Sequence, residues 1–398
     1  MKEIKNKVNT NKITEGSIFG QLLLFFFPIL FGTFFQQLYN TADAVVVGRF
    51  VGKQALAAVG GTTSTLINLL VGFFVGLSSG ATVVISQFYG ARKPDKVHWA
   101  VHTAVAFSLI GGVLFMIIGV VFAHMALSAM HTPEDVLTYA VVYIRIYFLG
   151  MIPNLIYNMG AGILRAVGDS KRPLYFLIGS CMVNILLDLI LVAGLRLGVA
   201  GAAIATVISQ MASCAFVLLS LRSHKMPVRL GWGGFQASVI RRIVTFGFSP
   251  FLILASDSIL LIVLNTVLQK YGGPGEGDTL VTCATIVQSY LLLITMPMGG
   301  ITLGSQPVVS FNYGKGDPDR IKKAIQCITG LCVIFCIFMT IVTQTISPLY
   351  VRLFTTDSVI LARSVTYIKR FTAMIIPLAI QYPLVDETTA LGKVGQAL

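Results

Sequence analysis

The chain has 398 residues with a formal net charge of +13, and 55% of them are apolar while only 11% are charged. A soluble domain carries about 25% charged residues, so this composition excludes most soluble proteins, and the apolar content also excludes disorder. The 38 glycines show no triplet period and six cysteines are few, which excludes collagen-like chains and disulfide scaffolds. A polytopic membrane protein built of helices remains, and its partner is the lipid bilayer.

Ten apolar stretches separated by short polar loops predict ten membrane-spanning helices, each of about 20 residues or more. In chain order they run near residues 18–40, 55–88, 97–124, 137–160, 173–195, 200–221, 240–268, 280–310, 324–346 and 359–382. We expect a tail (1–16), a six-helix N lobe (17–221), a linker (222–239) and a four-helix C lobe (240–398).

Lys and Arg are distributed unequally between alternate loops. The loops on the side of the N-terminus hold 20 of them, the opposite loops hold 5, and four more fall within the predicted spans. The positive-inside rule therefore predicts a multi-pass protein of the cell membrane with its N-terminus in the cytoplasm. Because the positive charge reports topology, we expect no nucleic-acid partner.

The chain contains an internal repeat at an offset of 224 residues. Tyr89-Gly90 matches Tyr313-Gly314, Gly168 matches Gly392, and the offset holds across five separate segments. Six spans, an even number, make up the first copy, so the two copies are parallel repeats. The N lobe continues after Gly168 through two more spans, whereas the chain stops at Leu398. We therefore expect ten of twelve spans, with the C-terminus truncated.

Three acidic residues lie in apolar surroundings, where an ionisable group costs at least about 2.5 kcal/mol and marks a function by default. They are Asp43, Asp188 and Asp257. Asn184 shares a helix face with Asp188, four residues away, and Thr206 pairs with Gln210 in the same way on the next span. We expect a polar pocket holding Asp43 and Asp188. Hydrogen bonding between helices is the alternative for the amides and Thr206.

Further polar residues indicate where a substrate binds. Gln36 and Tyr39 precede Asp43 in span one, where Pro28 breaks the helical hydrogen bonding. Asp257 follows Pro250 in span seven, the repeat counterpart of span one, and could contact an ion or a drug. The substrate-binding candidates are Tyr39, Gln36, Asn158, Asp257 and Gln210.

Catalytic and nucleotide-binding motifs are missing from the sequence. It has no G-x-S-x-G, H-E-x-x-H, Walker A or Rossmann pattern, and its cysteines lack metal-ligand spacing. We expect no enzyme, no cofactor and no metal site beyond a Na⁺ at Asp43 and Asp188. His98 and His102 share a helix face without an acidic ligand, which favours a polar interfacial role. Transport of a substrate against its concentration gradient would then have to be driven by an ion gradient.

Several motifs together resemble the multidrug and toxic compound extrusion (MATE) transporters, and within them the bacterial MepA-like group. The similarity runs from about residue 15 to 395 and is carried by Pro28…Gln36-Gln37-Leu-Tyr39-Asn-Thr-Ala-Asp43, Gln87-Phe-Tyr-Gly90-Ala-Arg, Leu164-Arg165-Ala-Val-Gly168-Asp169 and Gly198-Val-Ala-Gly201. This resemblance implies a twelve-helix, two-lobe fold and export of cationic or amphipathic drugs by Na⁺ or H⁺ antiport. It also implies an ion site at Asp43, Asn184, Asp188 and Thr206, with Tyr39 in the same cavity.

The leading hypothesis is a monomeric secondary-active transporter that works by alternating access and confers antibiotic resistance. The first alternative is a flippase for lipid-linked precursors, which would need several basic side chains for pyrophosphate. Only Arg145, Arg363, Lys369 and Arg370 lie near such positions. An intramembrane enzyme or a passive channel is the third hypothesis, although the spans offer neither a nucleophile–base pair nor a repeated filter motif.

Overall fold

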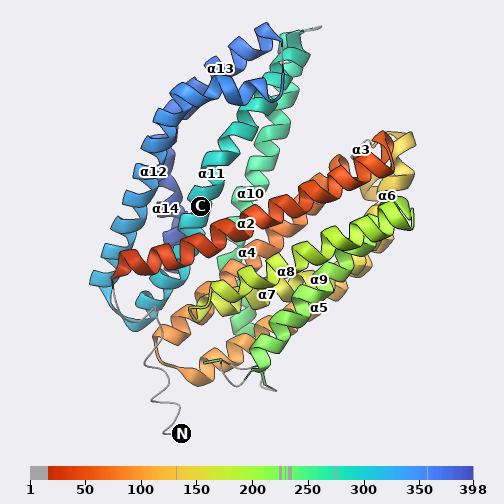
Figure 1. Cartoon of the computed structure of the whole chain (residues 1–398). Coiled ribbons are helices and arrows are strands. Elements are labelled where there is room, and N and C mark those ends of the chain that lie inside the picture. Colours follow the sequence, from red (N-terminus) through yellow and green to blue (C-terminus); the bar gives the residue numbers. More distant parts are fainter. Residues whose placement is uncertain are drawn as a thin grey trace.

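The computed structural model describes residues 17–397 except 131, 224–225, 229, 232–234, 274–275 and 356. The side chains at 62, 254, 257, 258, 262, 265 and 278 also lie outside the described part. Within the described residues all regular structure is helical, which confirms the predicted all-α class (Figure 1).

The helices of the first half occupy nearly all of the predicted N lobe. They are α2 (Ile18–Phe50), α3 (Lys53–Gly60), α4 (Thr62–Gly90), α5 (Pro94–Ala129), α6 (Glu134–Leu149), α7 (Met151–Ala166), α8 (Lys171–Asp188), the π-helical η2 (Leu189–Gly194) and α9 (Gly198–Arg222). Two predicted spans are not straight single helices. The second breaks at Gly61 between α3 and α4, and the fourth bends by 52° at Gly150 between α6 and α7.

The second half repeats this plan over a shorter length. Its helices are α10 (Ala237–Gly272), α11 (Glu276–Lys315), α12 (Pro318–Arg352), α13 (Ser358–Ala373), α14 (Ile375–Ala390) and the short α15 (Val394–Ala397). Both α5 and α12 begin with a proline, which suits the first helical position because it has no N–H to leave unpaired. In Figure 1, α12, α13 and α14 form one group and the helices α5 to α9 form another.

Seven helices of the described residues are long and apolar enough to cross a membrane, or eight if the bent pair α6–α7 is one span. The sequence predicts ten. The difference lies in predicted spans seven and ten. Several side chains of α10 lie outside the described part, and only Ile259–Gly272 of it counts, as a shorter apolar helix, while the pair α13–α14 does not meet these criteria. α13 and α14 have only 16 residues each, and α13 carries Arg363, Lys369 and Arg370.

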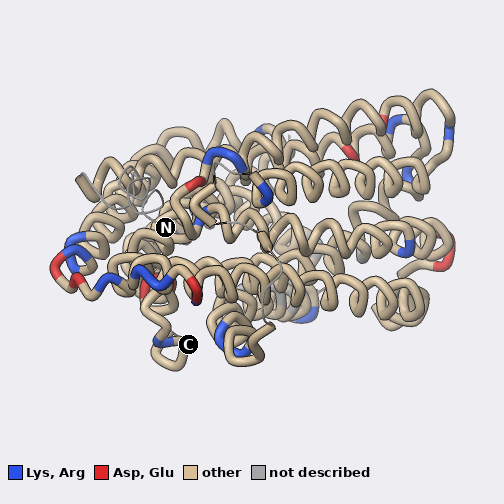
Figure 2. The backbone as a smooth tube through the Cα atoms, turned by 90° about the horizontal axis from the view of Figure 1, so that it is seen from below, with Lys and Arg blue, Asp and Glu red and all other residues tan. Residues whose placement is uncertain are grey.

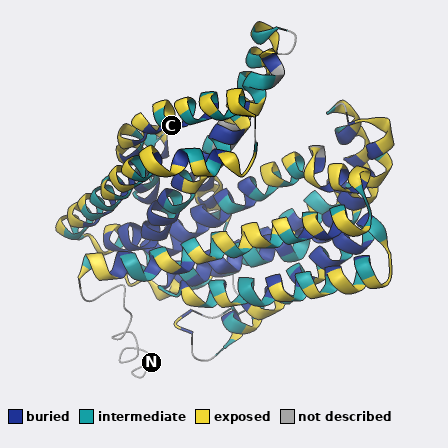
Figure 3. Cartoon of the chain, turned by 45° about the horizontal axis from the view of Figure 1, so that its top comes forward, coloured by how far each residue is buried: buried dark blue, intermediate teal, exposed yellow. Residues whose placement is uncertain are grey.

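The outward faces of the long helices are apolar, as contact with lipid requires. On α5, Ile110, Val121 and Met125 are each 60% exposed or more. Figure 3 shows exposed residues along the outer faces of the helices and buried ones between them. Most of the chain in Figure 2 is free of charge, and Lys and Arg are more numerous in the half of the molecule that contains both termini.

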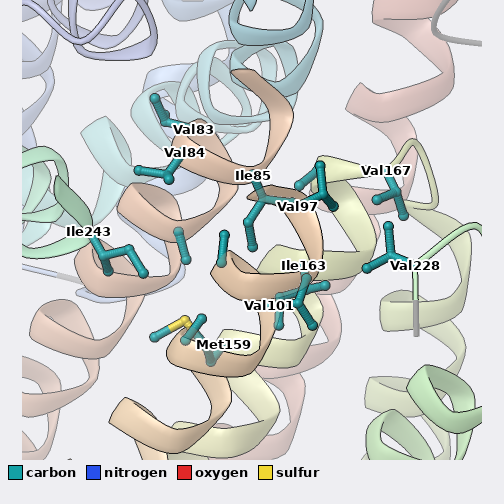
Figure 4. Close-up of a cluster of buried hydrophobic side chains, with 14 of the residues drawn as sticks. Val83, Val84, Ile85, Val97, Val101, Met159, Ile163, Val167, Val228 and Ile243 are labelled. Carbon is teal, nitrogen blue, oxygen red and sulfur yellow. The ribbon is translucent and has the colours of Figure 1, made fainter. Parts of the chain in front are cut away.

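The largest buried cluster joins the two halves of the chain. It packs Val84 of α4 and Val101 of α5 against Ile163 of α7, and it includes Ile243 of α10 (Figure 4). Helix α4 lies against both α10 and α11 of the second half. The approach is close at Gly80, where an added Cβ would lie 2.1 Å from the carbonyl oxygen of Ile243. Small residues permit such backbone contact between membrane helices.

The 224-residue repeat is visible in matched contacts. Ser86 and Ser310 each donate a side-chain hydrogen bond to a carbonyl 80 residues further on, to Ala166 at 3.2 Å and to Ala390 at 2.9 Å. Gly168 (φ 97°) and Gly392 (φ 80°) both adopt the left-handed conformation that glycine tolerates. The two parallel repeats therefore share local geometry as well as sequence.

The segment that joins the halves is fixed at one point by a histidine. Nε2 of His102 accepts a hydrogen bond from the backbone N–H of Gly231 at 2.8 Å, and the ring of His98 lies 4.8 Å from that of His102. Within the described residues, no group of three His, Cys, Asp or Glu side chains could hold a metal ion. His102 therefore binds the linker to α5, and His98 packs against it.

Candidate ion and substrate site

Three helices and η2 position the predicted polar pocket. Asp43 lies on α2, Asn184 and Asp188 on α8, and Thr206 on α9, and each side chain is at most 4% exposed. The carboxyl groups of Asp43 and Asp188 lie within interaction distance of each other. Tyr143 of α6 adds a fourth helix, because its hydroxyl donates to Oδ2 of Asp43 at 3.1 Å. The structure therefore brings both carboxylates together.

Most polar atoms in this pocket have no hydrogen-bond partner among the residues that the structure describes. Oδ1 of Asp43, both side-chain polar atoms of Asn184, both carboxylate oxygens of Asp188 and Oγ1 of Thr206 are buried without a hydrogen bond. Buried polar groups are normally paired, since an unpaired one is unfavourable by roughly 1–3 kcal/mol. Two neighbouring carboxyl groups can share a proton, and hard cations prefer oxygen ligands. The oxygens of the pocket are therefore suited to bind a proton or a hard cation such as Na⁺.

Asp188 lies at a change in helix geometry. It is the last residue of α8, and the π-helical turns of η2 begin at the next residue. A π-helix widens the turn and frequently occurs at functional sites. Hydropathy and residue spacing carry no signal for it, so the sequence predicted an ordinary helix here.

A cavity of about 270 Å³ lies beside the pocket. Its lining includes four of the five predicted substrate-binding residues, which are Gln36, Tyr39, Asn158 and Gln210. The fifth, Asp257, lies in α10, and its side chain is outside the described part of the chain. Tyr39 connects the cavity with the polar pocket, because it lines the cavity and lies beside Asp43 and Thr206.

Pro28 interrupts α2 at the wall of this cavity. A proline has no N–H, so the carbonyl four residues earlier loses its helical partner. That carbonyl belongs to Leu24, and the hydroxyl of Ser170 donates to it at 3.2 Å. The side chain of Ser170 thus replaces the missing helical hydrogen bond.

Two charged residues that were not singled out from the sequence lie inside helices. Arg165 follows predicted span four, which ends near residue 160, but it lies in the last turn of α7 and lines the cavity. Glu387 follows predicted span ten, which ends near residue 382, but it lies on α14. It is 1% exposed, its Oε1 accepts from the Ser305 hydroxyl at 2.7 Å, and its Oε2 has no partner. A closer estimate of where each apolar run ends would have placed both inside the helices.

The basic residues considered for a pyrophosphate ligand lie elsewhere. Arg145, Arg363, Lys369 and Arg370 are all absent from the described lining of the cavity. Arg363 instead contacts the carboxylate of Glu276 at the start of α11. The structure gives no support to the flippase alternative.

Comparison with known proteins decides the family. A family model described as MatE matches residues 28–190 and 254–394, about three quarters of the chain. The chain belongs to the MatE family. The matched segments contain Asp43, Asp188 and Glu387, and this family assignment confirms the resemblance inferred from the motifs.

Among its relatives, this MatE protein is 29% identical to the probable multidrug resistance protein YoeA of Bacillus subtilis over 327 residues, which cover 80% of this chain and 69% of YoeA. It is 24% identical to the multidrug export protein MepA of Staphylococcus haemolyticus over 361 residues, which cover 90% of this chain and 78% of MepA.

A solved structure described as the outward-facing conformation of a multidrug resistance MATE family transporter of the MOP superfamily has the same fold. It superposes with a TM-score of 0.87 at 22% identity, covering 100% of this chain and 86% of that one. The MatE chain is thus a multi-pass membrane protein with the predicted two-lobe helical architecture.

Proposed function

We propose that this MatE protein is a multidrug exporter driven by antiport of H⁺ or Na⁺. The names of its relatives support export of drugs. One observation supports the ion coupling: Asp43 and Asp188 lie close together in a buried pocket, and three of their four carboxylate oxygens have no hydrogen-bond partner among the described residues. Cationic or amphipathic drugs would occupy the adjacent cavity. The protein would act as a monomer in the cell membrane with its N-terminus in the cytoplasm.

The mechanism follows from the contact between pocket and cavity. An ion that binds at Asp43 and Asp188 cancels negative charge behind Tyr39, a cavity residue. The hydrogen bond from Tyr143 to Asp43 then changes, and the part of α2 around Pro28 is free to rearrange because its helical bonding is already interrupted. Drug affinity falls when the cavity changes shape.

Alternating access requires that each ligand bind the inward- and outward-facing states with different affinity, because equal affinity shifts no equilibrium. The ion would favour the state that releases drug to the outside. Drug would favour the state in which the ion site is empty. Competition between ion and drug is therefore the expected thermodynamic signature of the exporter.

Efflux of a fluorescent cationic dye from cells that express the chain tests the proposal. Asp188→Asn keeps the size of the side chain but cannot release a proton or carry charge, so we expect efflux to fall at least about tenfold. Asp169→Asn is the matched control, because Asp169 forms a partly exposed ion pair with Arg172 outside the pocket. Normal efflux by Asp188→Asn would overturn the ion-site assignment.

A further inference from the structure

The charge of the cavity wall is a separate property from the charge of the ion pocket. Asp43 and Asp188 are not among the residues that line the cavity. Arg165 is the one Asp, Glu, Lys, Arg or His in the described lining. A substrate in this cavity therefore meets a positive side chain directly, while the two carboxylates lie behind Tyr39.

Within the described residues, no carboxylate neutralises Arg165. The three ion pairs found there join Arg172 to Asp169, Lys315 to Asp317 and Arg363 to Glu276. Asp169 is the acidic residue closest to Arg165 in sequence, and its Oδ2 lies 3.1 Å from Nε of Arg172. A cation without a counter-charge is unfavourable inside a membrane and is normally paired or functional.

Hydrogen bonds fix Arg165 in place and leave most of its donors available. Its Nη2 donates to the Ser78 hydroxyl at 3.1 Å, and that hydroxyl lies 2.6 Å from the carbonyl oxygen of Asn158, to which it donates. A guanidinium has five N–H donors in a planar fork that matches a carboxylate or phosphate. The side chain of Asn158 also lines the cavity.

The rest of the wall combines uncharged polar residues with apolar and aromatic ones. Ile29, Leu174 and Leu177 form part of it, and the rings of Tyr39 and Tyr147 supply flat amphipathic surfaces. A ligand that fits this wall would place a planar or apolar body against these residues. Its polar end would reach the guanidinium.

We propose that, among the amphipathic drugs of the exporter, the cavity favours those that carry an anionic group, a carboxylate, sulfonate or phosphate, and that Arg165 binds that group. The inference rests on the proposed exporter function and specifies its substrate class. A zwitterion fits as well as a simple anion, since the tyrosine rings can face its cationic part.

A matched pair of dyes on one scaffold tests this with the purified full chain in detergent. Rhodamine 110 has a free carboxylate, whereas rhodamine 123 is its methyl ester and lacks that charge. We expect the wild-type chain to bind rhodamine 110 at least about tenfold more tightly, as a charge-assisted pair predicts. Arg165→Gln should abolish the preference, and Arg165→Lys should restore part of it, because lysine keeps the charge without the fork.

Arg172→Gln is the matched control, since it removes a positive charge seven residues away from Arg165 and outside the cavity lining. It should keep the preference. Equal binding of both dyes by the wild-type chain would overturn this inference and leave the exporter function intact. Failure to bind rhodamine 110 would also overturn this inference, whereas the exporter function is tested separately by the efflux assay. The comparison on the wild-type chain needs no variant, so a folding defect in Arg165→Gln cannot hide the answer.

Discussion

Gly90 and Gly314 occupy equivalent positions in the two repeats, and each lies against the backbone of the other's helix. A Cβ on Gly90 would lie 2.0 Å from the carbonyl oxygen of Phe311, and a Cβ on Gly314 would lie 2.0 Å from that of Gln87. Phe311 and Gln87 are themselves 224 residues apart. The contact therefore obeys the two-fold symmetry of the repeat, and it joins the C-terminal ends of α4 and α11.

Gly90→Ala or Gly314→Ala should break this contact between the lobes. The atoms that a new methyl group meets belong to backbone, which cannot rotate away, and overpacking of this kind destabilises by about 1–3 kcal/mol. We expect a lower Tm in detergent and reduced efflux. Gly299→Ala is the control on α11, because nothing lies within 4 Å of its Cβ position. Equal Tm values for all three variants would contradict the symmetric contact.

Tyr143→Phe should change the pH dependence of efflux. The lost hydroxyl donates to Asp43, and a hydrogen bond to a charged carboxylate is worth about 1.5–3 kcal/mol. Without it the pocket holds a proton more readily, so the pH at which efflux falls to half should rise by about one to two units. Tyr175→Phe, at a residue 61% exposed on α8, is the control. An unchanged profile would show that Asp43 does not bind the transported proton.

Pro28 and Ser170 should be energetically coupled. In the natural chain, Ser170→Ala leaves the Leu24 carbonyl without its donor and should destabilise by about 0.5–1.5 kcal/mol. In a Pro28→Ala background the backbone N–H of residue 28 replaces that donor, so the same change should have less effect. A double-mutant cycle on thermal stability measures this coupling. Strictly additive effects would show that the Ser170 bond does not compensate for the proline.

Glu387→Gln should leave the chain at least as stable as the natural protein. In the described part of the chain, Glu387 is buried without a cation partner, and its one hydrogen bond there, from Ser305, can also be accepted by an amide oxygen. A buried unpaired charge is unfavourable, so its removal relieves the cost of burial. The measurement is Tm in detergent. A clear fall in Tm would mean that Glu387 has a partner that matters for the fold.

The fold was predictable because membrane helices are long and apolar, and both properties can be read from the sequence. The runs that became α5 and α12 needed only hydropathy, and the offset that pairs Gly168 with Gly392 predicted the repeat. The breaks were not predictable in the same way. Gly61 and Gly150 interrupt runs that look continuous, since glycine is common in membrane helices and its presence does not show where a helix bends.

The pocket was predictable from chemistry, and the cavity wall was not. Asp43 and Asp188 stand out because an acid in an apolar run is rare. Arg165 lies at the end of such a run, where a basic residue normally marks a loop. Its side chain points into a cavity that residues from several helices complete, and only the three-dimensional arrangement reveals this.

Transport in proteoliposomes, with H⁺ and Na⁺ gradients imposed separately, tests the central claim most directly. Purified full chain should move a fluorescent substrate against its gradient when one of these ion gradients is present, and Asp188→Asn should abolish that movement. Active transport that persists in Asp188→Asn, or that needs neither gradient, would contradict coupling through the Asp43 and Asp188 pocket.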